Sequence, residues 1–179
     1  MVAISEQVFL LYNFLPVLNL TATPQICIID KSRAYRRIVE GLLRALGYSR
    51  VETFECSQDI LDLNLRPDIL IIDHESGDTR ISGLDFFRLY GTNKFSDTKF
   101  IFLSSNTDLN IAVSAIRLGA FDYILKSKTG LERLASRLEK LVKLYKSNYR
   151  RTLLLRRALV SLGMTGLILL MAILFYLNS

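Results

Sequence analysis

The sequence predicts an α/β domain in which helices cover both faces of a doubly wound, five-stranded parallel sheet. Two observations support this fold class. Five short apolar segments alternate with five segments of helical character between Gln25 and Tyr145, and strands that alternate with helices are typical of parallel sheets. The apolar segments are also nearly uninterrupted, as expected of strands that are buried on both faces.

The first strand and the first helix have the plainest signals. The run "QICIID" at residues 25–30 is short and apolar, and it predicts a buried strand. The segment "RAYRRIVEGLLRALG" at 33–47 predicts a helix that Gly47 closes. Its apolar positions at helical spacing are Ile38, Leu42, Leu43 and Leu46.

The same alternation predicts the other elements in chain order. Apolar runs predict strands, and the segments between them have helical character. We expect strands at 50–55, 67–73, 98–104 and 121–126. We expect helices at 57–65, 83–93 and 107–119, and a last helix that begins near Thr129.

The C-terminal segment has a different composition. Residues 158–177, "ALVSLGMTGLILLMAILFYL", contain no charged residue and follow Arg156 and Arg157. At the helical rise per residue, about 20 residues span roughly 30 Å of hydrocarbon. We therefore expect a transmembrane helix at 158–177, with a buried core helix as the alternative.

The positive charge of the chain is concentrated before this segment. Residues 131–179 carry nine Lys or Arg against two acids, whereas residues 1–130 carry 14 against 15. The basic pI is therefore a local property, and it favours a cytoplasmic location for residues 1–157 over nucleic-acid binding. The bases would also attract anionic lipid, and a solvated helix face is the alternative.

Two further features say less about function. The apolar run at 8–20 has no Lys or Arg before it, so we expect an amphipathic or loosely packed extension rather than a signal peptide. Cys27 and Cys56 are expected to be reduced thiols.

Four polar residues end the predicted strands. They are Asp30, Asp73, Ser104 and Lys126. The carboxyl ends of parallel strands meet at one edge of a sheet, where ligands bind. Two acids, a hydroxyl and a lysine at one edge are suited to phosphoryl transfer onto a carboxylate, with a divalent cation neutralising the oxygens.

With these residues at the strand ends, the sequence resembles the receiver domain of two-component response regulators. The chemotaxis regulator is the single-domain form of this family. The resemblance covers about two-thirds of the chain, residues 25–145. It implies a flavodoxin-like or CheY-like sheet with strand order 2-1-3-4-5, and a protein that is not itself an enzyme. The segments that carry it are "IIDKSRAYRRIVEGLLRALGY", "PDILIID", "SGLDFF", "FIFLSS" and "RLGAFDYILKS".

The resemblance also implies roles for single residues. Asp73 is expected to be the phosphoacceptor and Asp30 an acidic residue of a Mg²⁺ pocket. Ser104 and Tyr123 are the expected switch residues, and Lys126 is expected to bind the phosphoryl group. The implied partner is a histidine kinase or a phosphotransfer protein.

Three positions depart from the family pattern. Receivers usually have two adjacent acids after the first strand, whereas Asp30 is followed here by Lys31, and a fixed ammonium opposes cation binding. The loop "HESGDTRISG" after Asp73 is two residues longer than the commonest form and lacks its proline. Ser127 replaces the proline that usually follows the lysine.

Lys31 has three possible roles. It could pair with Asp73 and lower the pKa of that carboxyl. It could join Lys126 in binding a phosphoryl group and partly replace Mg²⁺. It could also turn to solvent while Glu75 or Asp78 supplies the missing carboxylate.

The chain has little room for a nucleic-acid effector after the receiver, so we expect none. A heptad series instead predicts a possible homodimer through the helix 131–157, with Asn148 fixing register. We expect its first four leucines to pack the last helix onto the sheet, and the part beyond Tyr145 to form the dimeric helix. The series is Leu131, Leu134, Leu138, Leu141, Tyr145, Asn148, Thr152, Leu155, Leu159 and Leu162.

These observations give an organisation and two functional hypotheses. We expect an N-terminal extension at 1–24, a receiver domain at 25–145, a basic helical linker at 146–157 and a transmembrane helix at 158–177. The first hypothesis is a single-pass protein of the bacterial inner membrane whose cytoplasmic receiver is phosphorylated on Asp73. The second is a pseudo-receiver that docks partners at the membrane without phosphorylation.

Overall fold

The structure is a computed structural model that describes the backbone of residues 23–75 and 81–177. Side chains at 148, 150, 151, 153, 156, 157, 167–172 and 175 are not described. The expected N-terminal extension therefore lies almost entirely outside the described residues. The proposed roles of Asp78 and of the Asn148 side chain lie outside them too.

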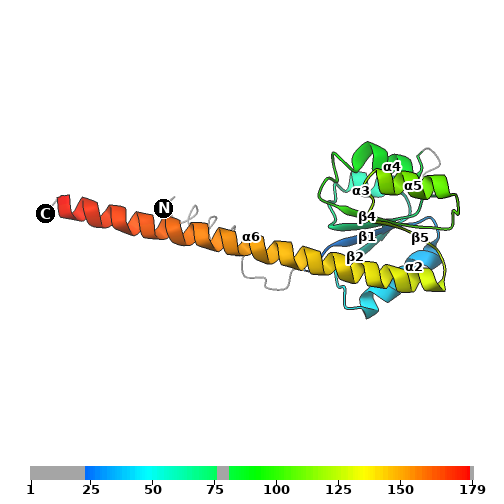
Figure 1. The fold of residues 1–179 in the computed structure, drawn as a ribbon, viewed down its shortest axis with the longest axis horizontal. Coiled ribbons are helices and arrows are strands. Elements are labelled where there is room, and N and C mark those ends of the chain that lie inside the picture. The colour runs from blue at the N-terminus through cyan, green and yellow to red at the C-terminus, as the bar shows by residue number, and fades with distance from the viewer. Residues whose placement is uncertain (1–22, 76–80, 178–179) are drawn as a thin grey trace. The chain divides into compact units, whose positions relative to one another are not determined.

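Five parallel strands form one sheet (Figure 1). They are β1 (Ile26–Ile29), β2 (Val51–Phe54), β3 (Ile69–Ile72), β4 (Lys99–Ser104) and β5 (Asp122–Leu125). Their order is β2-β1-β3-β4-β5, with every neighbouring pair parallel. The predicted fold class and strand order are confirmed.

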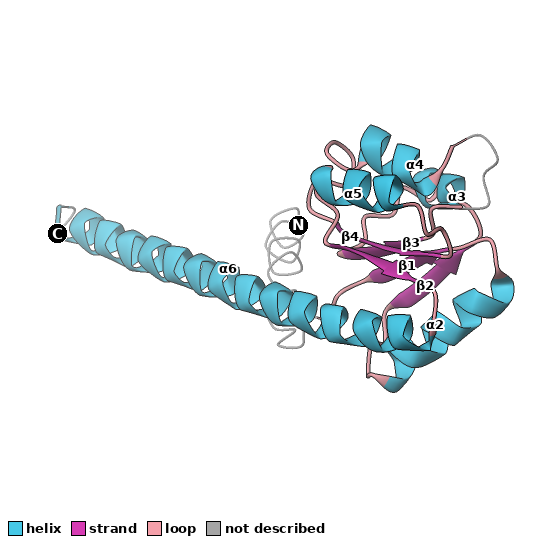
Figure 2. Ribbon diagram, turned by 45° about the vertical axis from the view of Figure 1, so that its right-hand side comes forward, coloured by secondary structure: helices cyan, strands magenta, loops and turns pink. Residues whose placement is uncertain are grey.

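Helices cover both faces of this sheet. They are α2 (Arg33–Ala45), α3 (Ser57–Asp62), α4 (Gly83–Tyr90), α5 (Leu109–Arg117) and α6 (Lys128–Leu177). The helices α3, α4 and α5 lie on one face, and α2 and the first part of α6 lie on the other (Figures 1 and 2). The sheet is therefore the middle of three layers.

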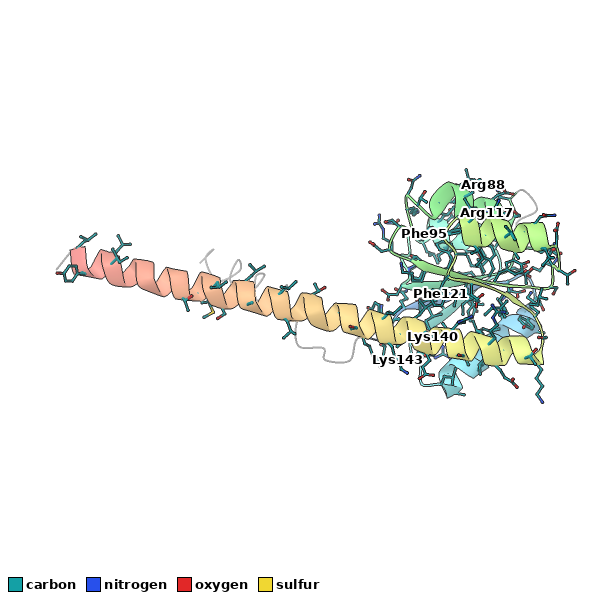
Figure 3. The ribbon with its side chains drawn as sticks, viewed as in Figure 1. Arg88, Phe95, Arg117, Phe121, Lys140 and Lys143 are labelled. Carbon is teal, nitrogen blue, oxygen red and sulfur yellow. The ribbon has the colours of Figure 1, made fainter. Side chains whose placement is uncertain are left out.

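Two hydrophobic cores follow from this layering, because successive residues of a strand point to opposite faces. Ile28 and Ile71 pack on the side of α2 and α6, whereas Ile29 and Ile72 pack on the side of α3, α4 and α5. The second core is rich in aromatic rings. Phe95 lies on that side in Figure 3, and Phe121 lies on the α6 side.

Helix α2 buries Leu43, as expected, but Ile38 and Leu46 of the expected set are not buried. Val39 and Leu43, four residues apart, are fully buried, whereas Ile38 and Leu46 are 51% and 46% exposed. Residues four apart lie on one face of a helix, and this face rather than the Ile38 face meets the sheet. Helix α3 also ends earlier than expected, since Asn64 has a left-handed backbone with φ of 49°.

The first part of α6 packs onto the sheet. Leu134, Leu138 and Leu141 are buried, and Leu131 is partly buried against the same core. Residues Thr23–Val142 form one compact unit, and residues 143–177 belong to a second. The first four leucines of the heptad series thus pack onto the sheet, as expected for them.

The transmembrane prediction for 158–177 is not supported by the structure. In the parts of the chain that the structure describes, no helix is long and apolar enough to cross a membrane. The backbone of this segment continues α6, and seven of its side chains, at 167–172 and 175, lie outside the description.

Candidate functional site

Two buried carboxylates and one ammonium group meet at the carboxyl edge of the sheet. Asp30 follows β1, Asp73 follows β3 and Lys126 follows β5. The Lys126 Nζ lies 2.7 Å from the Asp30 Oδ2 and 2.5 Å from the Asp73 Oδ2. The two aspartates are only 3% and 4% exposed. The structure thus brings together three residues that the sequence places 43 and 53 positions apart along the chain.

The charge of Lys126 is maintained by these carboxylates. Burial lowers the pKa of the Lys126 ammonium, but the hydrogen bonds and negative charges of Asp30 and Asp73 outweigh this effect and raise the pKa above its usual value. The Tyr35 ring centroid also lies 4.8 Å from Nζ, which adds a cation–π contact. Lys126 is therefore a fixed positive charge beside Asp73 at neutral pH.

The turn after β1 holds Asp30 in place. The Asp30 Oδ1 accepts a hydrogen bond of 2.8 Å from the Ser32 backbone N–H. The Ser32 hydroxyl in turn caps α2 by accepting from the Tyr35 N–H. The Arg36 guanidinium donates to the Asp30 carbonyl. Because Asp30 is tied to the start of α2, it has little freedom to follow a ligand.

Lys31 pairs with a different carboxylate from the two that Lys126 contacts. Its Nζ lies 2.6 Å from the Glu75 Oε2, and both side chains are about half exposed, 56% and 54%. The hydrogen bond and charge of Glu75 raise the pKa of Lys31. The Glu75 N–H also donates to the Asp73 Oδ1 at 3.3 Å. Lys31 is thus paired with Glu75, and Glu75 is linked through its backbone to Asp73.

The expected switch residues converge on a third residue, Asn106. Ser104 is fully buried, and its Oγ accepts from the Asn106 N–H at 3.2 Å. The Tyr123 hydroxyl donates to the Asn106 carbonyl at 3.0 Å, and its ring stacks on Phe102. Burial raises the pKa of Tyr123, so its hydroxyl keeps its proton at neutral pH. The sequence interpretation missed Asn106, although its position two residues after Ser104 in a polar turn was a signal.

Two glycines allow the chain to pass close to the pocket, and neither was singled out in the sequence. A Cβ on Gly83 would lie 2.2 Å from the Asp73 carbonyl oxygen, and one on Gly130 would lie 2.0 Å from the Leu125 carbonyl oxygen. The Gly83 N–H donates to the His74 carbonyl at 2.7 Å. A side chain at either position would push apart the segments that present Asp73 and Lys126.

Comparison with known protein families shows to which family the chain belongs. A profile of the family described as response regulator receiver domain matches residues 26–139. The chain belongs to the receiver domain family. The match ends within the first part of α6 and contains every pocket residue discussed above.

Individual relatives of this receiver agree with the assignment. The chain is 33% identical over 103 residues to the DNA-binding transcriptional regulator NtrC from Klebsiella pneumoniae. That match covers 55% of this chain and 21% of NtrC, so the chain spans about one fifth of the length of this relative.

Solved structures are similar in fold. A response regulator from Thermotoga maritima is 27% identical with a TM-score of 0.57, and the match covers 68% of this chain and 98% of that one. The chemotaxis response regulator CheY4 of Vibrio cholerae is 20% identical with a TM-score of 0.55, over 67% and 99% of the two chains. These likenesses support the receiver fold.

The pocket of this receiver does not fit the Mg²⁺ site that the resemblance implies. Within residues 23–75 and 81–177, no three His, Cys, Asp or Glu side chains are grouped as metal ligands. Lys31 stands where the family has a second acid, and its ammonium also pairs with the Glu75 carboxylate. The pocket thus lacks one acid and contains one ammonium more than the family pattern, and this positive charge repels a divalent cation.

Proposed function

We propose that this receiver accepts a phosphoryl group on Asp73 in two-component signalling, from a histidine kinase or a phosphotransfer protein. Receiver domains generally interact with such partners. The observation that supports the proposal is the contact of 2.5 Å between the Lys126 Nζ and the Asp73 Oδ2, in a pocket where Asp73 is 4% exposed. In such a pair the carboxylate can act as the nucleophile, and the ammonium can bind the anionic group that the carboxylate attacks.

The proposed chemistry follows from the contacts of Asp73. One carboxylate oxygen forms a bond to phosphorus, while the bond from phosphorus to the donor breaks and the donor leaves with the electron pair. Lys126 then binds oxygens of the attached phosphoryl group. The Ser104 hydroxyl, at the end of β4, is the proposed switch group, and Asn106 links it to Tyr123 through two hydrogen bonds.

A second candidate function is a docking module that works without phosphorylation. The ion pairs of Lys126 with Asp30 and Asp73, and of Lys31 with Glu75, favour it, because they balance most of the pocket charge without any ligand. In this case the pocket would only stabilise the fold.

A phosphorylation experiment separates the two candidates. The 179-residue chain is incubated with acetyl phosphate, and the mass gain of one phosphoryl group is measured by intact-protein mass spectrometry. We expect a gain that hydroxylamine removes and that is lost in Asp73→Asn. The exposed Asp62→Asn serves as a matched control and should retain the gain. A wild-type chain that gains no mass under any ionic condition would leave the docking module as the function.

We further propose, from sequence alone, that the chain is tethered to the bacterial inner membrane. Support comes from the 20 residues without charge at 158–177 and the preceding Arg156 and Arg157. The expected result is that the chain sediments with membranes and resists extraction by carbonate, whereas a chain ending at Tyr145 does not sediment. Recovery of both chains in the supernatant would refute the tether.

A further inference from the structure

The two carboxylate oxygens of Asp73 contact different donors. The Lys126 Nζ contacts its Oδ2, and the Glu75 N–H contacts its Oδ1. The Glu75 carboxylate in turn holds the Lys31 Nζ at 2.6 Å. Lys31 is therefore linked to Asp73 through Glu75, whose backbone contacts the Asp73 oxygen that Lys126 does not contact.

The formal charges of the pocket differ from those that the family pattern would give. Asp30, Asp73 and Glu75 are opposed here by Lys31 and Lys126, which leaves one net negative charge. With an acid at position 31, four carboxylates would face a single ammonium. Such a pocket needs a divalent cation before it can receive an anionic phosphoryl group, whereas this one already contains the compensating charge.

Lys31 is also free to change its partner. Its side chain and that of Glu75 are about half exposed, so their ion pair is weak and exchanges readily with water. A phosphoryl group on Asp73 carries about two negative charges, in place of the single charge of the free carboxylate. Glu75 can then turn to solvent while Lys31 moves to the phosphoryl oxygens on its flexible stem.

We propose that this receiver is phosphorylated on Asp73 without a divalent cation, with Lys31 and Lys126 together binding the phosphoryl oxygens. This inference rests on the proposed function. With acetyl phosphate as donor, an Asp73 carboxylate oxygen bonds to phosphorus as the acetate–phosphorus bond breaks. Acetate leaves with the electron pair, and no proton is consumed. The mismatch between the pocket and a Mg²⁺ site is the observation that supports it.

The test compares phosphorylation with and without a metal ion. The 179-residue chain is incubated with acetyl phosphate in the presence of either MgCl₂ or EDTA, and the rate of mass gain is measured. We expect the two rates to agree within about twofold, since Lys31 already supplies the charge. In Lys31→Asp we expect the rate in MgCl₂ to exceed the rate in EDTA by at least about tenfold, because the acid restores a cation site.

Three variants control this comparison. Lys140→Asp makes the same charge change on an exposed part of α6 (Figure 3) and should behave as wild type. Asp73→Asn gives the background mass gain, which does not come from Asp73. Glu75→Gln releases Lys31 from its ion pair, and we expect a faster gain in EDTA; a slower one would contradict the proposed role of Lys31.

The outcomes separate the two proposals. A wild-type gain in MgCl₂ that disappears in EDTA overturns the cation-independent mechanism and leaves phosphorylation of Asp73 standing. No gain in either condition, from a chain with an intact thermal transition, overturns both. As a second readout, MgCl₂ should leave the melting temperature of the wild type unchanged and raise that of Lys31→Asp. A Mg²⁺-induced rise in the wild type would also refute the inference.

Discussion

Lys126 is the residue on which the pocket depends, because its single ammonium group satisfies two buried carboxylates. Without it, Asp30 and Asp73 would be two like charges in a poorly solvated site with no ammonium between them, which is costly. The receiver therefore balances the charge of Asp73 through a residue that follows a different strand.

The titration of single residues predicts how stability depends on pH. Burial, together with the charge of Glu52, raises the pKa of the Cys27 thiol from 9.0 to about 12. The pKa of Lys126 is also raised in the folded chain. A group whose pKa is raised by folding stabilises the fold below its unfolded pKa, and this contribution is lost as the pH rises. We expect the free energy of unfolding to be constant near neutrality and to fall above about pH 9.

Urea unfolding at a series of pH values measures this dependence. Cys27→Ala removes the first group to titrate, so its stability should begin to fall at a higher pH than that of the wild type. An identical profile in both proteins would show that the Cys27 thiol does not contribute.

Gly83 gives a prediction of backbone packing. In Gly83→Ala the new Cβ would lie 2.2 Å from the Asp73 carbonyl oxygen, so the loop must shift. We expect a loss of about 1–3 kcal/mol in the free energy of unfolding and slower phosphorylation. Gly41→Ala makes the same change in α2, where no neighbour lies within 4 Å, and should stabilise by about 0.5–1 kcal/mol. Equal effects of the two variants would contradict the role of Gly83.

At the scale of elements, β5 and α6 are joined by an ion-pair cluster. Asp122 at the start of β5 is buried, and its carboxylate lies 2.7 Å from the Arg133 Nη2 and 2.6 Å from the Arg137 Nε. These arginines lie four residues apart on one face of α6, so they approach the same carboxylate. The cluster and the buried leucines together fix α6 next to the strand that presents Lys126.

Removal of this carboxylate should weaken the attachment of α6. We expect Asp122→Ala to lower the free energy of unfolding by about 1–3 kcal/mol, since charged hydrogen bonds are lost. The change is measured by urea unfolding. Glu40→Ala removes the Arg44 pair on the surface of α2 and should cost less than about 0.5 kcal/mol. A larger loss in Glu40→Ala than in Asp122→Ala would refute this ranking.

At the scale of the whole molecule, the hydrophobic cores end at Val142. The buried members of both clusters lie between Ile26 and Val142, and the described leucines beyond are exposed, as at Leu154, Leu155 and Leu159. The receiver unit thus contains its own core on both faces of the sheet.

A truncation tests this independence. We expect a chain ending at Tyr145 to unfold in one cooperative transition, with a melting temperature within about 4 °C of that of the 179-residue chain. Circular dichroism during heating measures it. Loss of cooperativity in the shorter chain would show that the segment after Tyr145 contributes to the core.

The order of strands and helices was predictable because it depends on local patterns. The continuous apolar run before Asp73 and the helical spacing before Gly47 are visible in the sequence. The buried face of α2 was not, since Ile38 and Val39 are both apolar and only contact with the sheet selects Val39. Asn106, Gly83 and Gly130 were missed for the same reason, because their importance lies in the proximity of distant segments.

The sequence by itself determined the receiver fold and the residues at the carboxyl edge of its sheet, because a parallel α/β topology brings the strand ends together whatever the side chains do. Only the tertiary structure decided how those residues pair. It paired Lys126 with Asp30 and Asp73, and it paired Lys31 with Glu75, which is none of the three roles that the sequence left open for Lys31. Ion pairing depends on distances of a few ångströms between side chains from different loops, and no pattern along the chain encodes these distances.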